Sequence, residues 1–137
     1  MDVGKQPILL VVDDTGTWLT RVMKLGEEMG FFVLTAAGGN MAMNLLDKYP
    51  EITAVITDVQ MQPVDGMEIL QFLFRCETQP KTLVHSSEQT YRPRGGEVCD
   101  LEEWVTKYFG EFARFALKSN DLIAQRAFLE EILAARQ

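Results

Sequence analysis

Two short apolar segments that run directly into acidic residues constrain the fold of this chain more than any other feature. Residues 54–57 are apolar and largely β-branched and lead into Asp58, and residues 8–12 lead into Asp13 and Asp14. Runs this short and apolar are typical of strands buried on both faces of a parallel sheet. Ligands of such sheets bind outside the carboxyl ends of the strands. If the two strands are neighbours, three carboxylates meet there, and we expect a cation, Mg²⁺ above all, to hold them together.

The alternative for these acids is that each is an isolated loop residue or helix cap. That interpretation suits one acid better than it suits acids after both of the strongest strand segments in the chain. The shared site is therefore the favoured hypothesis.

Composition limits the classes of function. The 137 residues suit one domain with one core, and a hydrophobic share of 47% argues against disorder. The net charge of -7, without a cluster of Lys or Arg, argues against binding to a nucleic-acid backbone. We find no membrane span and no signal peptide. Cys76 and Cys99 lack motif spacing, so reduced thiols and a cytoplasmic location are expected.

Strand and helix signals alternate along the chain. The expected strands cover residues 7–12, 31–36, 52–57, 82–85 and 112–117. The expected helices cover residues 17–29, 41–49, 67–76 and 122–136, with another that starts at residues 100–103 and ends at Gly110. Residues 88–99 are expected to form a long loop. This alternation predicts an α/β fold in which helices cover both faces of a parallel sheet.

The acidic residues and their surroundings resemble the receiver domain of two-component response regulators, over nearly the whole chain. The resemblance rests on Asp13-Asp14, on Asp58 with Met61 and Asp65-Gly66 downstream, and on Ser86 after the fourth strand. It implies a doubly wound, flavodoxin-like sheet of five strands in the order 2-1-3-4-5. It also implies that residues 1–137 form a single receiver domain.

The resemblance implies a signalling phosphoacceptor rather than an enzyme, with only slow self-phosphorylation and dephosphorylation. A histidine kinase or phosphotransfer protein would pass a phosphoryl group to Asp58, with Mg²⁺ as the cofactor. The implied metal ligands are Asp14, Asp58, the backbone carbonyl of Gln60 and, through water, Asp13. The implied phosphoryl contacts are Ser86 and Lys118, and the implied switch residues are Ser86 and Phe115.

The implied output is a change in a protein-binding face built from residues 100–110, 112–117 and 122–136. That face would bind an unknown downstream protein, and a homodimer through the same face is a further option. No nucleic-acid or membrane partner is expected. Since no effector segment follows within the sequence, the chain would act alone or as a piece of a longer protein.

The family needs a lysine at the end of its fifth strand, and two lysines compete for that place. Lys118 follows the strand-like segment 112–117, and Lys107 lies nearer to Ser86. We favour Lys118 because that register gives every segment a sensible length. The Lys107 register would leave a helix broken by Pro93 and Gly95-Gly96.

Three departures from the family pattern stand out. Ser119 occupies the place of the proline that usually follows the lysine across a cis bond, and a cis bond before a non-proline residue costs about 2.5–4 kcal/mol. Pro63 comes one place later than usual. The segment 88–99 is long and carries Arg92 and Arg94, which are either solvated or close enough to touch the phosphate or a partner.

Two other functions stay open from the sequence. Residues 13–19 also resemble the first motif of haloacid-dehalogenase-type phosphotransferases, with Asp13 as the nucleophile and Ser86 and Lys118 as the next two motifs. No acidic pair follows a strand after Lys118, so the fourth motif of that family is missing. The second alternative is a receiver fold that acts as an unphosphorylated interaction module.

Overall fold

The computed structural model describes residues 5–93 and 95–136. Five parallel strands form the main sheet in the order β2-β1-β3-β4-β7. The strands are β1 (Ile8–Val12), β2 (Phe32–Ala36), β3 (Ala54–Asp58), β4 (Lys81–Ser86) and β7 (Ala113–Leu117). The helices are α1 (Gly16–Glu28), α2 (Gly39–Lys48), α3 (Gly66–Phe74), α4 (Leu101–Phe109) and α5 (Ile123–Ala134). The predicted doubly wound order is confirmed.

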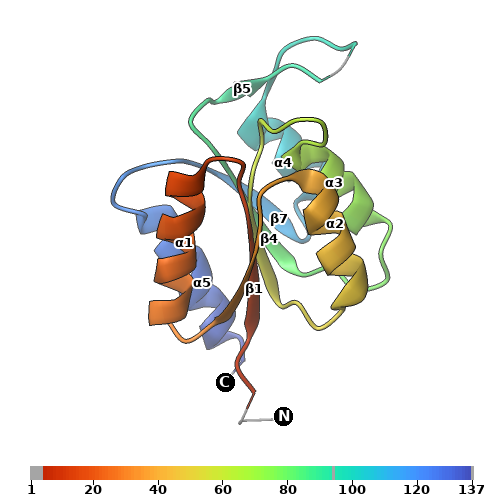
Figure 1. Ribbon diagram of the computed structural model, residues 1–137. Helices are drawn as coiled ribbons and strands as arrows, with labels where there is room; N and C mark the ends of the chain where they lie inside the picture. The colour runs from red at the N-terminus through yellow and green to blue at the C-terminus, as the bar shows by residue number, and fades with distance from the viewer. Residues whose placement is uncertain (1–4, 94, 137) are drawn as a thin grey trace.

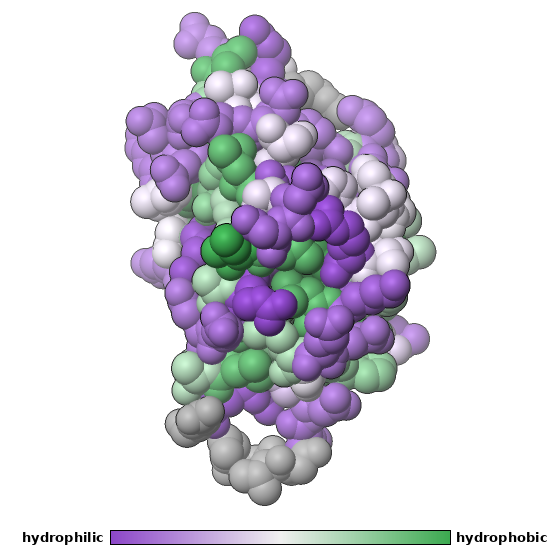
Figure 2. Space-filling model, turned by 90° about the vertical axis from the view of Figure 1, so that its left-hand side faces the viewer, coloured by the Kyte–Doolittle hydropathy of each residue, from purple (hydrophilic) through white to green (hydrophobic). Residues whose placement is uncertain are grey.

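Helices α1 and α5 cover one face of the sheet, and α2, α3 and α4 cover the other (Figure 1). Each face therefore has its own apolar core, one built around Leu9, Val11 and Ile56, the other around Leu10, Val12 and Val55. All of β3 is buried, which explains why residues 54–57 form a continuous apolar run. On the outer surface of α1 and α5, hydrophobic patches lie among hydrophilic side chains (Figure 2).

Strand register brings the carboxyl ends of β1, β3, β4 and β7 together. Val12 pairs with Thr57, so Asp13 continues β1 beside Asp58. Asp58 pairs with His85, and Ser86 pairs with Leu117, so Lys118 follows next to Ser86. The register alone thus gathers polar residues from four strands at one edge.

Most expected elements agree with the structure to within two residues at each end. Gly30 ends α1 with a φ of 98°, as its position predicts. On α4, Val105 and Phe109 are buried, whereas Tyr108 is 49% exposed. Lys107 and Tyr108 are exposed because they lie on the solvent-facing side of this amphipathic helix.

The expected long loop after β4 is instead largely a hairpin. Its strands are β5 (Thr90–Tyr91) and β6 (Cys99–Asp100), which pair antiparallel and stand beyond the end of the main sheet (Figure 1). The Tyr91 hydroxyl donates to Asp65 Oδ2, and its ring stacks on Trp104 with the centroids 6.1 Å apart. These contacts fasten the hairpin to α3 and α4.

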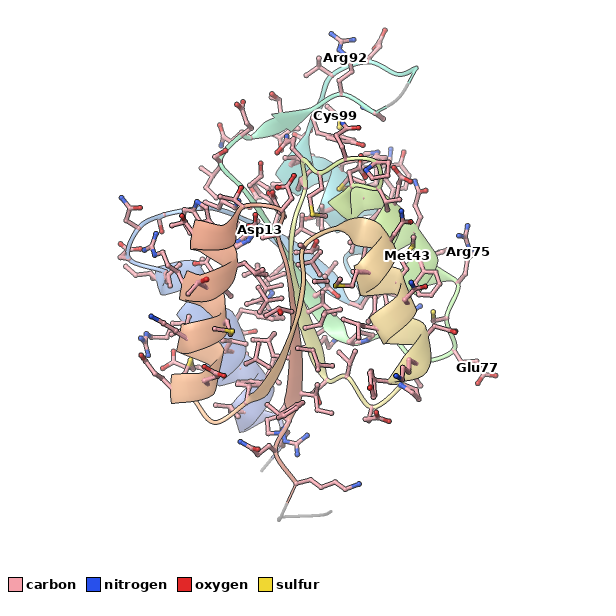
Figure 3. All side chains as sticks on the ribbon, viewed as in Figure 1. Asp13, Met43, Arg75, Glu77, Arg92 and Cys99 are labelled. Atoms are coloured by element: carbon pink, nitrogen blue, oxygen red, sulfur yellow. The ribbon has the colours of Figure 1, made fainter. Side chains whose placement is uncertain are left out.

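The three expected departures from the family pattern can be followed in the structure. Among the described residues the one cis peptide bond is Gln62–Pro63, and the bond after Lys118 is not cis. Arg92 donates to the Gly96 carbonyl, and Figure 3 shows its side chain at the outer end of the hairpin, away from Asp13. Arg94 lies outside the described residues. In the part of the chain that is described, no helix has the length and apolar character of a membrane span.

Candidate functional site

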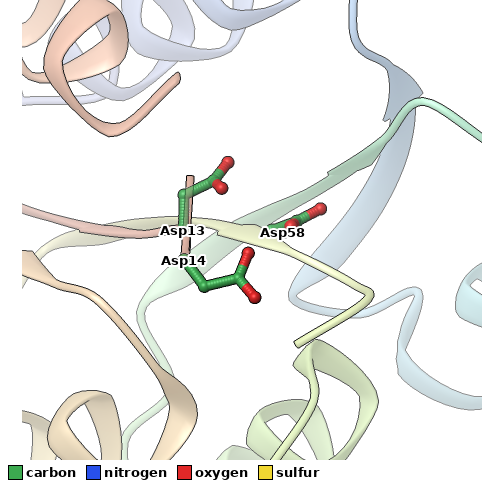
Figure 4. Close-up of side chains that lie close together, drawn as sticks. All are labelled: Asp13, Asp14 and Asp58. Atoms are coloured by element: carbon green, nitrogen blue, oxygen red, sulfur yellow. The ribbon is translucent and has the colours of Figure 1, made fainter. Parts of the chain in front are cut away.

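Three carboxylates meet at the carboxyl edge of the sheet, as the sequence predicts. Asp13, Asp14 and Asp58 each offer an oxygen within 4.8 Å of the others. The close-up shows the three side chains grouped between the ends of β1 and β3 (Figure 4). Asp13 and Asp58 are buried and Asp14 is exposed, so the site opens to solvent on the Asp14 side.

The Asp13 carboxylate is held on both oxygens. Its Oδ1 accepts from the Thr15 backbone N–H at 2.9 Å, and its Oδ2 lies 3.0 Å from Lys118 Nζ. The second contact is an ion pair that lacks the alignment of a hydrogen bond. Burial raises the pKa of Asp13, but His85, the Thr15 N–H and Lys118 together outweigh it and hold that pKa below its ordinary value. Asp13 is therefore an ionised, strongly oriented group.

The groups around the Asp58 carboxylate affect its pKa differently. Its Oδ1 accepts from the Val59 N–H at 2.9 Å and lies 3.3 Å from Lys118 Nζ. Burial and then the charge of Asp13 raise the pKa of Asp58, and Lys118 offsets part of this rise. Two neighbouring carboxylates whose environments push their pKa values in opposite directions mark a candidate functional site.

Lys118 reaches this site and Lys107 does not. The Lys118 ammonium lies between Asp13 and Asp58, with 7% of its side chain exposed, and 5.1 Å above the ring of Trp18. Lys107 is exposed in the last turn of α4, with its Nζ 5.2 Å from the ring of Tyr108. The structure thus agrees with the predicted place of Lys118, while its chemical role stays a prediction.

Ser86 lies at the same edge but is engaged elsewhere. Its hydroxyl donates to Gln60 Oε1 at 2.8 Å and accepts from the Glu88 N–H at 3.0 Å. The hydroxyl therefore joins the loop after β3 to the loop after β4. The predicted aromatic switch residue, Phe115, is half-buried in β7 against the core.

The donor set suits a hard divalent cation. Three carboxylates share this site with one ammonium, which pairs with Asp13 and Asp58, so two negative charges remain when all three acids are ionised. Carboxylate oxygens, one of them open to water, are what Mg²⁺ prefers. Asp13, Asp14 and Asp58 would hold the ion, and the Gln60 carbonyl stays a predicted fourth ligand.

Sequence reasoning missed two buried polar residues beneath the acids. His85 and Gln125 are fully buried, and His85 Nδ1 lies 3.0 Å from Gln125 Nε2. His85 Nε2 lies 3.7 Å from Asp13 Oδ2. The available signal was a histidine, the only one in the chain, directly after the apolar pair Leu83-Val84 and directly before Ser86.

Comparisons with known proteins agree with the observed fold. The family model described as the response regulator receiver domain matches residues 9–111. A response regulator receiver protein from Pseudomonas putida is 26% identical, with 97% of this chain and 99% of that chain covered and a TM-score of 0.72. The CheX-CheY-BeF3-Mg complex from Borrelia burgdorferi contains a chain 22% identical, with 98% and 91% covered and a TM-score of 0.74. No curated protein sequence matches this chain significantly.

Proposed function

The chain belongs to the response regulator receiver domain family, and on that premise we propose that Asp58 accepts a phosphoryl group from a histidine kinase or phosphotransfer protein. The observation that carries this proposal is the position of Asp58. It ends a buried strand, beside two further carboxylates and 3.3 Å from a buried ammonium. A carboxylate so placed can form an acyl phosphate.

The reaction is an in-line transfer. A carboxylate oxygen of Asp58 attacks phosphorus, and the P–N bond to the donor imidazole breaks as the new P–O bond forms. The imidazole leaves and takes up a proton. When bound, Mg²⁺ would offset the repulsion between the carboxylate and the phosphoryl oxygens.

The residues around Asp58 each have a part in this transfer. Lys118 already contacts Asp58, and its ammonium would pair with a phosphoryl oxygen once the acyl phosphate has formed. Ser86 would turn its hydroxyl from Gln60 to a second phosphoryl oxygen. Asp13, with both oxygens engaged, is a poorer nucleophile than Asp58, which disfavours the haloacid-dehalogenase alternative.

The new contacts of Lys118 and Ser86 bias a two-state equilibrium, since they exist only in the phosphorylated state. We expect the affinity of the face formed by α4, β7 and α5 for a downstream protein to change as a result. The location that suits this function is the cytoplasm, where the phosphoryl donor is found.

The test is phosphorylation by acetyl phosphate with Mg²⁺, followed by intact-mass spectrometry. Wild type should gain one phosphoryl group, and Asp58→Asn should gain none while keeping its fold, because the change is nearly isosteric. Labelling of Asp13 in the Asp58→Asn variant would instead support the haloacid-dehalogenase mechanism. A wild-type chain that takes up no phosphoryl group would support the interaction module.

A further inference from the structure

A buried polar chain runs from helix α5 to the acidic site. Gln125, on the inner face of α5, contacts His85 in β4, and His85 in turn faces Asp13. Both His85 and Gln125 have 0% exposure. Buried polar side chains are costly unless they are paired, so a chain of three at this depth calls for an explanation.

The contacts of His85 select one tautomer. The Gln125 amide nitrogen can only donate, so His85 Nδ1 accepts and the proton of the neutral ring lies on Nε2. The nitrogen that carries this proton lies 3.7 Å from Asp13 Oδ2. The opposite tautomer would turn a ring lone pair towards a carboxylate oxygen, and the two would repel each other.

The imidazole is also fixed in orientation. The ring of Trp18, from α1, meets it edge to face, with the centroids 6.0 Å apart and the planes at 74°. In the sheet, His85 pairs with Asp58 on one side and Ala116 on the other. Contacts from α1, α5 and two strands thus aim Nε2 at the acidic site.

Three buried atoms of these residues lack a hydrogen-bond partner: His85 Nε2, Asp13 Oδ2 and Gln125 Oε1. His85 Nε2 and Asp13 Oδ2 face each other beyond hydrogen-bond distance. At rest, Lys118 lies 3.0 Å from the same Oδ2. If Lys118 moves to a phosphoryl oxygen, His85 is the neighbouring donor that can take its place on Asp13.

We propose that His85 is a positioning residue for the Asp13 carboxylate, and that Gln125 ties helix α5 to it. The role of Asp13 as a metal ligand rests on the proposed function, whereas the His85 tautomer and its dependence on Gln125 do not. The contacts from Gln125 through His85 to Asp13 connect α5 to the acidic site without passing through Ser86 or Phe115. They would act on one carboxylate oxygen, Asp13 Oδ2, which His85 Nε2 faces at 3.7 Å.

The first test uses the fact that the chain has a single histidine. Imidazole ¹⁵N spectra of the metal-free protein should show Nε2 protonated and Nδ1 as an acceptor. Gln125→Leu removes the donor to Nδ1 and should give a mixture of tautomers. Ile132→Val, a packing change at another buried position of α5, should leave the spectrum of the single tautomer unchanged. A wild-type protein with Nδ1 protonated would overturn the proposal.

The second test is titration with Mg²⁺ alone, read by tryptophan fluorescence. The amide nitrogen of a glutamine reaches the place of His85 Nε2, whereas an asparagine reaches only the place of Nδ1. His85→Gln should therefore keep the Mg²⁺ affinity within about threefold, and His85→Asn should lose about tenfold or more, as is usual for residues that orient metal ligands. Gln125→Leu should give an intermediate loss.

The outcomes separate this inference from the proposed function. Equal Mg²⁺ affinities for His85→Gln and His85→Asn, in folded proteins of similar melting temperature, would overturn the positioning role. Wild-type labelling at Asp58 would in that case leave the proposed function standing. Conversely, a wild-type chain that binds Mg²⁺ with the predicted order of variants but accepts no phosphoryl group would support the positioning role and contradict the phosphoacceptor.

Discussion

Asp14 and Asp65 are acids near the same sheet edge, but their structural roles differ. Asp14 belongs to the three-carboxylate group, whereas Asp65 caps α3 by accepting from the Glu68 N–H at 3.0 Å. Asp14→Ala should weaken Mg²⁺ binding strongly, because it removes a charged ligand. Asp65→Ala should leave Mg²⁺ binding nearly intact and lower the free energy of unfolding by about 1 kcal/mol.

Each of these two variants is the control for the other. Mg²⁺ titration gives the metal affinity of each variant, and urea unfolding gives the free energy of unfolding of each. Equal losses of Mg²⁺ affinity would contradict the assignment of Asp14 as a ligand and of Asp65 as a cap.

At the scale of residues, the sequence predicts the groups that follow strands better than those inside elements. Asp13, Asp14 and Asp58 are found where they are predicted, because the end of a parallel strand fixes where the next side chain goes. His85 and Gln125 could not be predicted as partners. Their contact joins residues 40 positions apart, and it depends on how α5 packs on β4.

Gly66 shows how closely α3 approaches the site. A Cβ added at this glycine would lie 2.2 Å from the Asp58 backbone oxygen, a contact that no side-chain rotation relieves. Gly66→Ala should push the start of α3 away from β3 and lower the free energy of unfolding by about 1–3 kcal/mol. It should also slow phosphoryl uptake, since the loop that carries Gln60 moves with it.

Gly16→Ala is the matched control for this change. Gly16 lies in the first turn of α1, with nothing within 4 Å of an added Cβ, and alanine favours helix there. Urea unfolding should find it neutral or slightly stabilising. Similar losses of stability in the two variants would show that close approach is not the reason for Gly66.

Tyr91, in the hairpin of β5 and β6, makes the stability of the protein depend on pH in the alkaline range. Burial and the hydrogen bond to Asp65 raise the pKa of Tyr91 above its ordinary value of 10.0. The folded state therefore keeps the proton that the unfolded state releases, so this contribution is full below pH 10.0 and is lost as pH rises further.

Tyr91→Phe should remove that part of the alkaline loss. At neutral pH the variant should be less stable by about 1 kcal/mol, because a hydrogen bond to a charged group is gone. Thermal melts of both proteins from about pH 8 to 11 measure this difference. That pH range extends at least about one unit to each side of the ordinary tyrosine pKa. Parallel curves for the two proteins would contradict the role of Tyr91.

At the scale of elements, long periodic segments are predictable and short ones are not. The five main strands and five helices follow from apolar runs, stops and caps such as Gly30 and Asp100. Each strand of the hairpin has two residues, too few for a period, and Pro93 and Gly95-Gly96 between them read as a loop. Its stability comes from tertiary contacts of Tyr91 with Asp65 and Trp104.

On the scale of the whole molecule, the acidic site and the surface of α4, β7 and α5 are joined by β4 and β7. Ser86 pairs with Leu117, and the Lys118 N–H donates to the Ser86 carbonyl at 2.8 Å. Lys118 and Ser86 therefore move as one unit with the ends of two strands. If the proposed phosphoryl group pulls on Lys118, we expect the movement to be transmitted to β7, and with it to Phe115.

The sharpest prediction at this scale compares the two lysines. Lys118→Ala should still permit some labelling of Asp58, because the nucleophile stays in place, but it should uncouple labelling from changes at α4, β7 and α5. Removing the ammonium leaves Asp13 and Asp58 without their shared counter-ion, so Mg²⁺ should bind at least as tightly as in wild type. Lys107→Ala changes only an exposed cation and should behave as wild type. Beryllofluoride-induced chemical-shift changes measure the coupling, and a silent Lys118→Ala with an uncoupled Lys107→Ala would contradict the assigned roles.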